Sequence, residues 1–229
     1  MYKINRKHES SCLICENSLD YGLQLPYFFF NNDIVCCNCR KMLVECRRIV
    51  VLAGLEIRSL YQYNEFYRKL LIQYKEFGDE ALKDVVIYPF VNKLRKQYNG
   101  YTLIGVPSSL SKYKMRGFSH VKKMFELLAL DYREVFYKDE FIQKQQRYCT
   151  RKEISKHITL VDEEELKSPI LLVDDLVTTG STLLACFRLL SEKGYRVKAL
   201  VGAVSMKLLK EQRDSRCLEF ERRFKCRQR

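Results

Sequence analysis

The sequence lacks any apolar run long enough to cross a bilayer. Its longest uninterrupted apolar stretch, residues 49–55, is far shorter than the ~20 residues that a membrane helix needs. The first ten residues, MYKINRKHES, contain no apolar segment of the kind found in a secretory signal. Internal repeats and low-complexity segments are missing as well. We therefore expect a cytoplasmic protein with no membrane span.

Acidic residues are scarce, since 28 Asp and Glu stand against 41 Lys and Arg, which gives a formal net charge of +13. Such an excess favours an anionic partner, whether nucleic acid, a phosphorylated small molecule or a membrane surface. The basic residues are concentrated in two clusters and in the tail over 207–229, which carries nine basic and four acidic residues. A cluster without any acid contains Lys112, Lys114, Arg116, Lys122 and Lys123. A second cluster, with only Glu153 against it, contains Lys144, Arg147, Arg151, Lys152 and Lys156.

The 229 residues leave room for one full domain and a small module. From residue 49 onward, apolar stretches with strand character alternate with stretches of helical spacing. Expected strands or hairpins lie near 49–63, 101–106, 170–173 and 197–204, and expected helices cover 66–77, a segment from 79, 118–130 and 181–193. This alternation predicts an α/β domain with a mostly parallel sheet flanked by helices. The polar, basic segment 137–166 is predicted to be a hood outside the main sheet.

Cysteine is unevenly distributed, because six of the ten cysteines lie within residues 12–46. In a cytoplasmic protein this argues against a disulfide framework. Two C-x-x-C pairs separated by twenty residues supply the four thiolates of a tetrahedral, structural Zn²⁺ site. The predicted ligands are Cys12, Cys15, Cys36 and Cys39. Cys37 is an alternative to Cys36, although only Cys36 has the two-residue spacing to Cys39. We therefore expect a zinc module over residues 1–48, followed by the α/β domain over 49–229.

The stretch ILLVDDLVTTGST, residues 170–182, places two carboxylates at the end of an apolar strand. Ligands of α/β proteins bind at the carboxyl ends of parallel strands. The following turn opens a helix, whose N-terminus favours a phosphate group. The hydroxyls of Thr178, Thr179, Ser181 and Thr182 add donors, and Gly180 allows close approach of the backbone. Asp174 and Asp175 suit ribose hydroxyls or Mg²⁺. A ribose with a 5-phosphate and a 1-pyrophosphate has both kinds of group.

This stretch closely resembles the phosphoribosyl pyrophosphate (PRPP) signature of the type I phosphoribosyltransferases. The resemblance implies that Asp174 and Asp175 face the ribose diol and Mg²⁺, and that residues 178–182 hold the 5-phosphate. The segment GVPSS is similar to the pyrophosphate loop of that superfamily, with Ser108 and Ser109 as donors. The segment KYKMRGF resembles its mobile basic loop, in which Arg116 would be the catalytic cation that neutralises the leaving pyrophosphate.

The order of the motifs narrows the resemblance. A four-cysteine knuckle, LYQYNEFYRKLLIQYKEFGD, VPSSLSKYKMRGFSH and the PRPP signature follow one another as in the ComF family of bacterial competence proteins. This resemblance implies a role in natural transformation, with PRPP, Mg²⁺ and single-stranded DNA as ligands. Other competence proteins, such as a helicase or strand-processing factors, are implied partners. The candidate DNA-binding residues are Lys112, Lys114, Arg116, Lys144, Arg147, Arg151 and Lys152.

The sequence is compatible with three functions. The chain is a phosphoribosyltransferase-like protein that binds PRPP and DNA, an active phosphoribosyltransferase with an unknown acceptor, or a partner-docking protein of the competence machinery. No residue in the signature is an obvious general base, because Thr178 occupies the position where several base-using relatives carry an acid.

Overall fold

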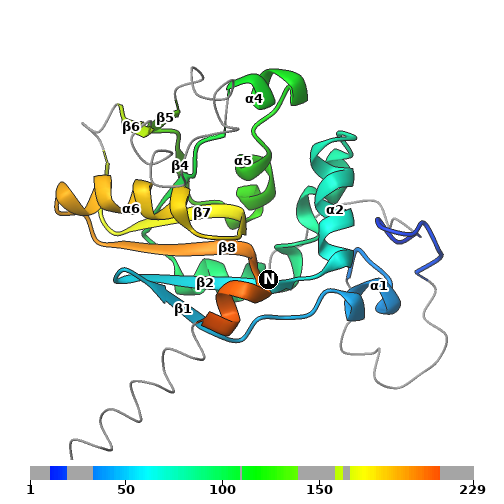
Figure 1. The fold of residues 1–229 in the computed structure, drawn as a ribbon. Coiled ribbons are helices and arrows are strands. Elements are labelled where there is room, and N and C mark those ends of the chain that lie inside the picture. Colours follow the sequence, from blue (N-terminus) through cyan, green and yellow to red (C-terminus); the bar gives the residue numbers. More distant parts are fainter. Residues whose placement is uncertain (1–10, 20–32, 109, 139–157, 162–165, 212–229) are drawn as a thin grey trace, which may run out of the picture.

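The computed structural model describes residues 11–19, 33–108, 110–138, 158–161 and 166–211, and all structural statements below concern these residues (Figure 1). A six-stranded sheet runs through the molecule in the order β1-β2-β8-β7-β3-β4. Its strands are β1 (Ile49–Leu52), β2 (Leu55–Tyr63), β3 (Thr102–Gly105), β4 (Asp131–Arg133), β7 (Ile170–Val177) and β8 (Val197–Ser205). The β1–β2 hairpin is antiparallel, and the other neighbouring pairs are parallel. The predicted mostly parallel α/β sheet is confirmed.

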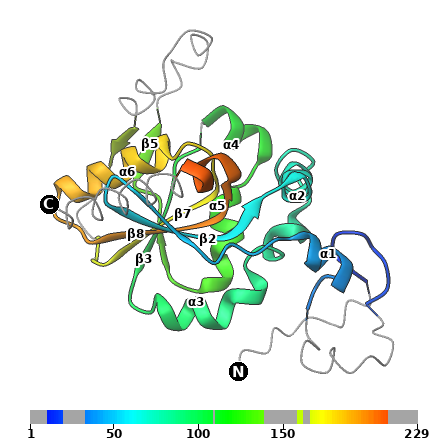
Figure 2. The ribbon, with the colours of Figure 1, turned by 60° about the horizontal axis from the view of Figure 1, so that its bottom comes forward.

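Helices cover both faces of this sheet, as Figure 2 shows for α3 and α6. On one face lie α2 (Glu65–Lys75), the 3-10 helices η2 (Glu80–Asp84), η3 (Tyr88–Phe90) and η4 (Glu126–Leu128), and the helices α3 (Val91–Gln97) and α5 (His120–Phe125). The opposite face is covered by α6 (Ser181–Glu192). Each face has its own apolar core, because alternate residues of a strand point to opposite sides. Val173 belongs to the core under α2 and α5, and Leu172 belongs to the core under α6.

Helix α2 forms from the expected apolar stripe but ends earlier than predicted. Asn64 caps its N-terminus by accepting from the N–H of Tyr67, and Leu70, Leu71 and Tyr74 are buried. Phe77 was predicted on the same stripe, but it lies beyond the last helical residue and is 80% exposed. The periodicity of a helix has no meaning past its end, so the prediction for Phe77 is wrong.

Three further elements differ from the expectation. The segment from Asp79 begins as a 3-10 helix, with Asp79 as the predicted N-cap. The helix predicted over 118–130 is α5 followed by η4. Residues 112–116, expected in a mobile loop, lie in the short helix α4 (Leu110–Arg116). The basic residues of this segment therefore stand on a helix that projects beyond the sheet (Figure 1).

The base of the predicted hood is a two-stranded antiparallel sheet of β5 (Phe136–Lys138) and β6 (Ile158–Leu160). Val135 and Ile158 are buried in the core that lies under α6, so the hood begins on that face of the main sheet. The predicted DNA-binding residues Lys144, Arg147, Arg151 and Lys152 lie outside the described residues. Among the described residues, no helix has the length and apolar composition that a bilayer span requires.

Candidate functional site

The four predicted zinc ligands come together in one cluster near the N-terminus. The sulfur atoms of Cys12, Cys15, Cys36 and Cys39 all lie within 4.8 Å of one another. A tight turn carries the first pair, because the N–H of Glu16 donates to the carbonyl oxygen of Cys12 at 2.9 Å. The second pair lies at the start of α1 (Cys37–Met42), for which Cys36 is the N-cap. Cys37 is not part of the cluster, so the structure supports Cys36 as the fourth member.

The cluster has the dimensions and donors of a tetrahedral thiolate site. Zn–S bonds of about 2.3 Å place tetrahedral sulfurs about 3.8 Å apart, and the sulfurs of Cys15 and Cys36 are 3.7 Å apart. Backbone N–H groups of Ile14 and Cys39 point at the sulfurs of Cys12 and Cys36, each at 3.5 Å. Burial raises the pKa of Cys36 and of Cys39, whereas backbone N–H donors outweigh burial at Cys12 and lower its pKa to about 7. These residues therefore fit a structural zinc ion.

Arg40, which the sequence reasoning missed, fastens the cysteine cluster to the α/β domain. Its guanidinium donates two hydrogen bonds to the carboxylate of Asp33, at 2.7 and 2.6 Å. The same side chain donates to the hydroxyl of Tyr61 in β2 at 3.1 Å and to the carbonyl oxygen of Val85 at 3.0 Å. Cys12 and Cys39 also share an apolar core with the domain. The described part of the predicted module over 1–48 is therefore packed on the domain that follows it.

Replacing Arg40 by lysine should lower stability without loss of metal. Lysine keeps the charge but loses the planar fork that reaches Asp33, Tyr61 and Val85 together. We expect a loss of about 2 kcal/mol in the free energy of unfolding, the size of one or two hydrogen bonds to a charged group. Denaturant unfolding and zinc analysis measure the two quantities. The matched control is Arg68→Lys, an exposed ion pair with Glu65, for which a change below about 1 kcal/mol is expected. Equal effects of both changes would contradict the role of Arg40.

The second candidate site lies at the carboxyl end of β7. This strand extends to Val177, so Asp174 and Asp175 are inside it and not after it. Because consecutive strand residues point to opposite faces, Asp174 shares the face of Leu172 and α6, and Asp175 shares the face of Val173, α2 and α5. Asp174 is half-buried, whereas Asp175 is buried. The side chains of these two adjacent aspartates thus lie on opposite faces of the sheet.

The turn after β7 brings the predicted phosphate-binding residues together at the start of α6. Thr178 and Thr179 are exposed, and the hydroxyls of Thr179 and Ser181 lie 3.0 Å apart. Gly180 has a φ of 76°, a left-handed conformation, and a Cβ there would meet a methyl of Leu52 at 2.7 Å. The N–H of Leu184 donates to the carbonyl oxygen of Gly180. The N–H groups of the residues before Leu184 therefore have no acceptor within the helix. The turn can therefore present N–H and hydroxyl donors to an anion.

The loop after β3 lies at the same edge of the sheet. Strand β3 pairs in parallel with β7, with Gly105 opposite Val173, and the N–H of Val106 donates to the carbonyl oxygen of Val173 at 3.0 Å. Ser108 follows after Pro107 and is half-buried, while Ser109 lies outside the described residues. Ser108 and Asp174 thus lie on or just after neighbouring parallel strands, at the same edge of the sheet.

Burial raises the pKa of Asp174 to about 7, although the charges of Lys75 and Lys138 act in the opposite direction. Lys138 is the last residue of β5, so the base of the hood places a cation near Asp174. A carboxylate whose charge is costly to bury gains most from a cation at its oxygens. Asp174 is therefore a residue that could hold a cation such as Mg²⁺.

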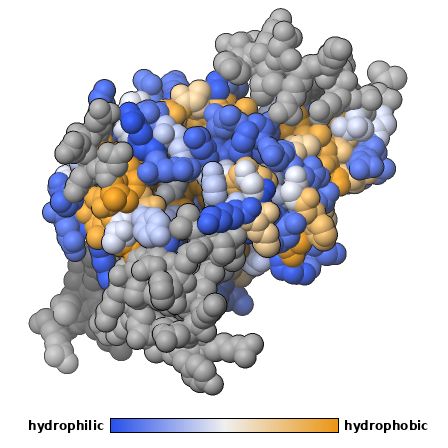
Figure 3. All heavy atoms as spheres, turned by 90° about the horizontal axis from the view of Figure 1, so that it is seen from above, coloured by the Kyte–Doolittle hydropathy of each residue, from blue (hydrophilic) through white to orange (hydrophobic). Residues whose placement is uncertain are grey.

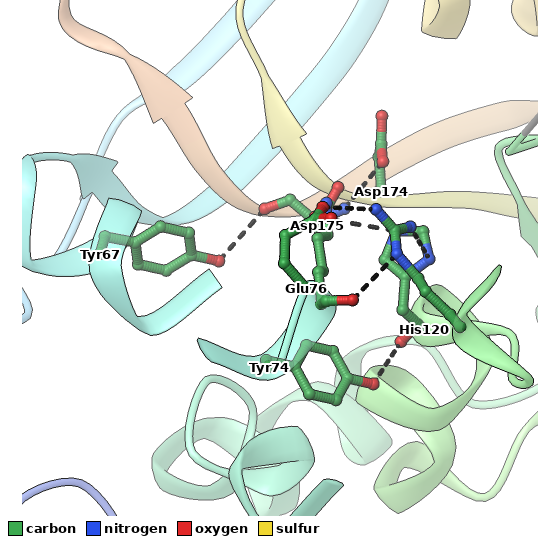
Figure 4. A network of polar contacts seen from close by, with 8 residues as sticks. Tyr67, Tyr74, Glu76, His120, Asp174 and Asp175 are labelled. Carbon is green, nitrogen blue, oxygen red and sulfur yellow. Dashed lines mark hydrogen bonds and ion pairs between the residues drawn. The ribbon is translucent and has the colours of Figure 1, made fainter. Parts of the chain in front are cut away.

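Asp175 lies in a network of polar residues on the other face, seen from close by in Figure 4. Its carboxylate forms an ion pair with the ammonium group of Lys75, and the Nε2 atom of His120 lies 3.8 Å from its Oδ2. The hydroxyl of Tyr67 donates to its carbonyl oxygen at 3.1 Å. Gly202 in β8 makes this last contact possible, because a Cβ there would meet the Tyr67 hydroxyl at 2.2 Å.

Arg116, the predicted catalytic cation, belongs to the same network. Its Nε atom donates to the carbonyl oxygen of Lys75 at 3.1 Å and its Nη2 to Glu76 at 2.9 Å. Its Nη1 lies 3.3 Å from the Nδ1 atom of His120, and the side chain is 6% exposed. The structure thus holds Arg116 against the end of α2, on the face of Asp175, and does not bring it to the turn over 178–182.

The predicted DNA-binding cations of the first cluster lie on or next to α4. Lys114 is exposed, as is Tyr113 beside it, at 45%. Figure 3, which looks down on this side of the molecule, shows hydrophilic side chains over much of the described surface, with hydrophobic patches between them. Lys112 lies in the first turn of α4. Phe118, in contrast, is buried and packs on Tyr74, so it belongs to the core.

Comparison with known proteins finds two curated relatives with the same description. The chain is 28% identical over 162 residues to the competence protein ComFC of Streptococcus pneumoniae (strain ATCC BAA-255 / R6), covering 68% of this chain and 70% of the relative. It is 26% identical over 218 residues to the competence protein ComFC of Bacillus subtilis (strain 168), covering 82% and 91%. No family model matches the chain.

Solved structures show more distant likenesses. A hypoxanthine phosphoribosyltransferase from Staphylococcus aureus has 14% identity and a TM-score of 0.30, covering 55% of this chain and 62% of that chain. The orotate phosphoribosyltransferase from Aeropyrum pernix has 19% identity and a TM-score of 0.32, covering 76% and 94%. The chain is thus similar to two ComFC competence proteins, and its mostly parallel α/β fold and N-terminal four-cysteine cluster agree with the predicted resemblance.

Proposed function

We propose that this protein is a phosphoribosyltransferase-like protein of DNA uptake that binds PRPP with Mg²⁺ and also binds single-stranded DNA. The observation that carries the proposal is the turn between β7 and α6. There, exposed hydroxyls, a left-handed glycine and a helix N-terminus follow the strand that carries Asp174, at the edge where parallel strands end. The role in DNA uptake rests on the two ComFC relatives, both described as competence proteins.

The residues divide between the two ends of the ligand. Thr178, Thr179, Ser181 and Thr182, with the backbone at Gly180, would hold the 5-phosphate. Asp174 would face the ribose hydroxyls and Mg²⁺, and the loop at Ser108 would receive the pyrophosphate. Mg²⁺ bridges carboxylates and phosphate oxygens and neutralises their charge. This assignment keeps the phosphate loop of the sequence prediction and reduces its acidic pair to one ligand-facing residue.

Replacing Asp174 by asparagine should weaken PRPP binding in the presence of Mg²⁺. The change removes a charged acceptor for the cation and the ribose while keeping the shape of the side chain. We expect affinity to fall about tenfold to a hundredfold, the equivalent of one charged hydrogen bond. Calorimetric titration of the full chain with PRPP and Mg²⁺ measures this loss. Asp131→Asn, at an exposed position of the edge strand β4, is the matched control and should bind as the wild type does. Unchanged affinity in Asp174→Asn would contradict the proposed PRPP site.

Binding is favoured over group transfer by the position of Arg116. The cation that would stabilise a leaving pyrophosphate is engaged with α2 and His120, and Thr178 offers no base. An active phosphoribosyltransferase with an unknown acceptor is the alternative. Pyrophosphate release from PRPP, assayed with and without candidate acceptors, separates the two, and sustained release would establish the enzyme.

Single-stranded DNA is the proposed macromolecular partner. The net charge of +13 supplies attraction to a polyanion, and α4 presents Lys114 next to the exposed ring of Tyr113. An aromatic ring among cations can stack on a base, which contributes about 1–3 kcal/mol per base. Phe118 is excluded from this role because it is buried. Docking of other competence proteins is the competing role for the same surface.

A further inference from the structure

We propose that Phe77, an exposed aromatic residue just after α2, stacks on a base of single-stranded DNA. The inference rests on the proposed DNA binding and deepens it, because it adds a residue outside the basic clusters and extends the DNA surface from α4 to α2. The bases of a duplex are stacked on one another, so a ring on a protein surface favours unpaired bases. The partner is therefore a single strand.

The turn that ends α2 holds Phe77 in an exposed position. Its side chain is 80% exposed, the highest value among the large apolar side chains of the described residues. The N–H of Phe77 donates to the carbonyl oxygen of Ile72 at 3.4 Å, and Gly78 follows with a φ of 71°, a left-handed conformation. Single exposed apolar side chains are ordinary on a protein surface, so the inference depends on what lies beside this ring.

The end of α2 is joined to the end of α4 by Arg116. Its Nε atom donates to the carbonyl oxygen of Lys75 at 3.1 Å, and its Nη2 atom donates to the carboxylate of Glu76 at 2.9 Å. Phe77 follows Glu76 directly, and Met115, which is 69% exposed, precedes Arg116. Figures 1 and 2 both show α2 next to α4. Exposed apolar side chains thus stand on both sides of this junction.

Helix α4 adds a second ring and a cation to the junction. Tyr113 is 45% exposed, and Lys114 beside it is exposed as well. Lys122 on the neighbouring helix α5 is also exposed. Aromatic rings among exposed cations are the combination with which proteins bind single strands, since the rings stack on bases and the cations attract phosphates.

The acidic side chains near the junction are engaged within the protein. Three of them form the ion pairs Glu76–Arg116, Glu80–Lys123 and Glu126–Lys83. A fourth, Asp79, accepts a hydrogen bond from the N–H of Ala81 at 3.2 Å. Because these carboxylates are paired or capped, they oppose a polyanion less than free ones would. Charge therefore favours a nucleic acid over an apolar protein segment as the partner of Phe77.

Replacing Phe77 by alanine should lower affinity for single-stranded DNA about fivefold to a hundredfold, the loss of one base stack. The slope of affinity against salt should stay unchanged, because the ring contacts no phosphate. Phe77→Tyr keeps a ring and should bind within about threefold of the wild type. Val51→Ala, at a 43% exposed position of the edge strand β1, is the matched control and should bind as the wild type does. Fluorescence anisotropy of the full chain with a labelled oligothymidylate measures all four proteins.

A second measurement reports stacking directly, because the chain contains no tryptophan. Phe77→Trp introduces a single indole at the proposed contact, and unlabelled oligothymidylate should quench its emission as the base stacks on it. Val51→Trp, the control, should keep its emission. Binding without quenching in Phe77→Trp would overturn the stacking role.

The wild type separates the failure of this inference from that of the proposed function. Wild-type binding with full affinity retained in Phe77→Ala would overturn the stacking role alone, and would leave the exposed ring to a protein partner. Equal losses in Phe77→Ala and Val51→Ala would also overturn it, since neither would then be a specific contact. Failure of the wild type to bind the oligonucleotide would refute the proposed DNA binding and the stacking role with it.

Discussion

Replacing Cys12 by serine should release zinc from the protein and destabilise far more than the N-terminal segment. A structural zinc site of four thiolates contributes about 10–16 kcal/mol of binding energy, and that energy stabilises the fold around it. Cys12 is 1% exposed and belongs to the apolar core that also contains Tyr61, Tyr67 and Val85. We therefore expect loss of metal, protease cleavage before Arg47 and a lower thermal midpoint for the whole chain. Metal analysis, limited proteolysis and thermal unfolding measure the three effects.

The chain contains a matched control for this experiment. Cys37 follows Cys36 directly but is not part of the four-sulfur cluster, so Cys37→Ser should keep one zinc per chain and the thermal midpoint of the wild type. Zinc loss in Cys37→Ser, with zinc retained in Cys36→Ser, would show that the shifted register is used. Retention of stoichiometric zinc in Cys12→Ser would contradict the site altogether. An unchanged midpoint after zinc loss would show that the module and the domain unfold independently.

Local patterns in the sequence predict the four-cysteine cluster and most strands of the sheet, although β4 was not among the expected strands. The C-x-x-C spacing predicts a cluster because each pair curls around one side of an ion, and the four sulfurs do come together. The apolar run from Ile170 predicts a buried strand, and Gly180 marks the tight turn that follows it. In each case the information lies within a few neighbouring residues, where spacing and side-chain type determine the geometry.

The contacts that the sequence did not predict join residues that are far apart. Lys75 and Asp175 are one hundred positions apart, and only the packing of α2 on β7 brings them together. The same holds for Arg40, whose fork reaches β2 and the end of η2. The sequence predicts that the strand ends at Val173, whereas β7 continues to Val177. The prediction stops at the first carboxylate because a carboxylate is expensive to bury. The cost is offset here by an ion pair from another element, which no local pattern reveals.

Binding of single-stranded DNA should be steep in salt and weak in sequence preference. Cations that contact phosphates release counterions, so the logarithm of the affinity should fall linearly with the logarithm of salt concentration, with a slope of about −0.7 per contact on a single strand. For roughly six contacts, affinity should fall on the order of 10² to 10³-fold between about 50 and 200 mM salt. Fluorescence anisotropy with labelled oligonucleotides of different sequence measures both properties. A flat dependence on salt would refute the electrostatic basis of binding.

The prediction of DNA binding can be tested most directly at Lys114, an exposed lysine of α4. Lys114→Ala should lower affinity for every sequence about equally and reduce the salt slope by about 0.7, as expected for one lost phosphate contact. Lys96→Ala is the matched control, since Lys96 is an exposed lysine of α3. Helix α3 leads into the start of β3, whereas α4 follows the end of that strand, so the two lysines lie toward opposite edges of the sheet. Equal effects of the two changes would indicate attraction by net charge alone, whereas an effect confined to Lys114 would place the DNA at the edge where Asp174, Ser108 and the turn before α6 meet.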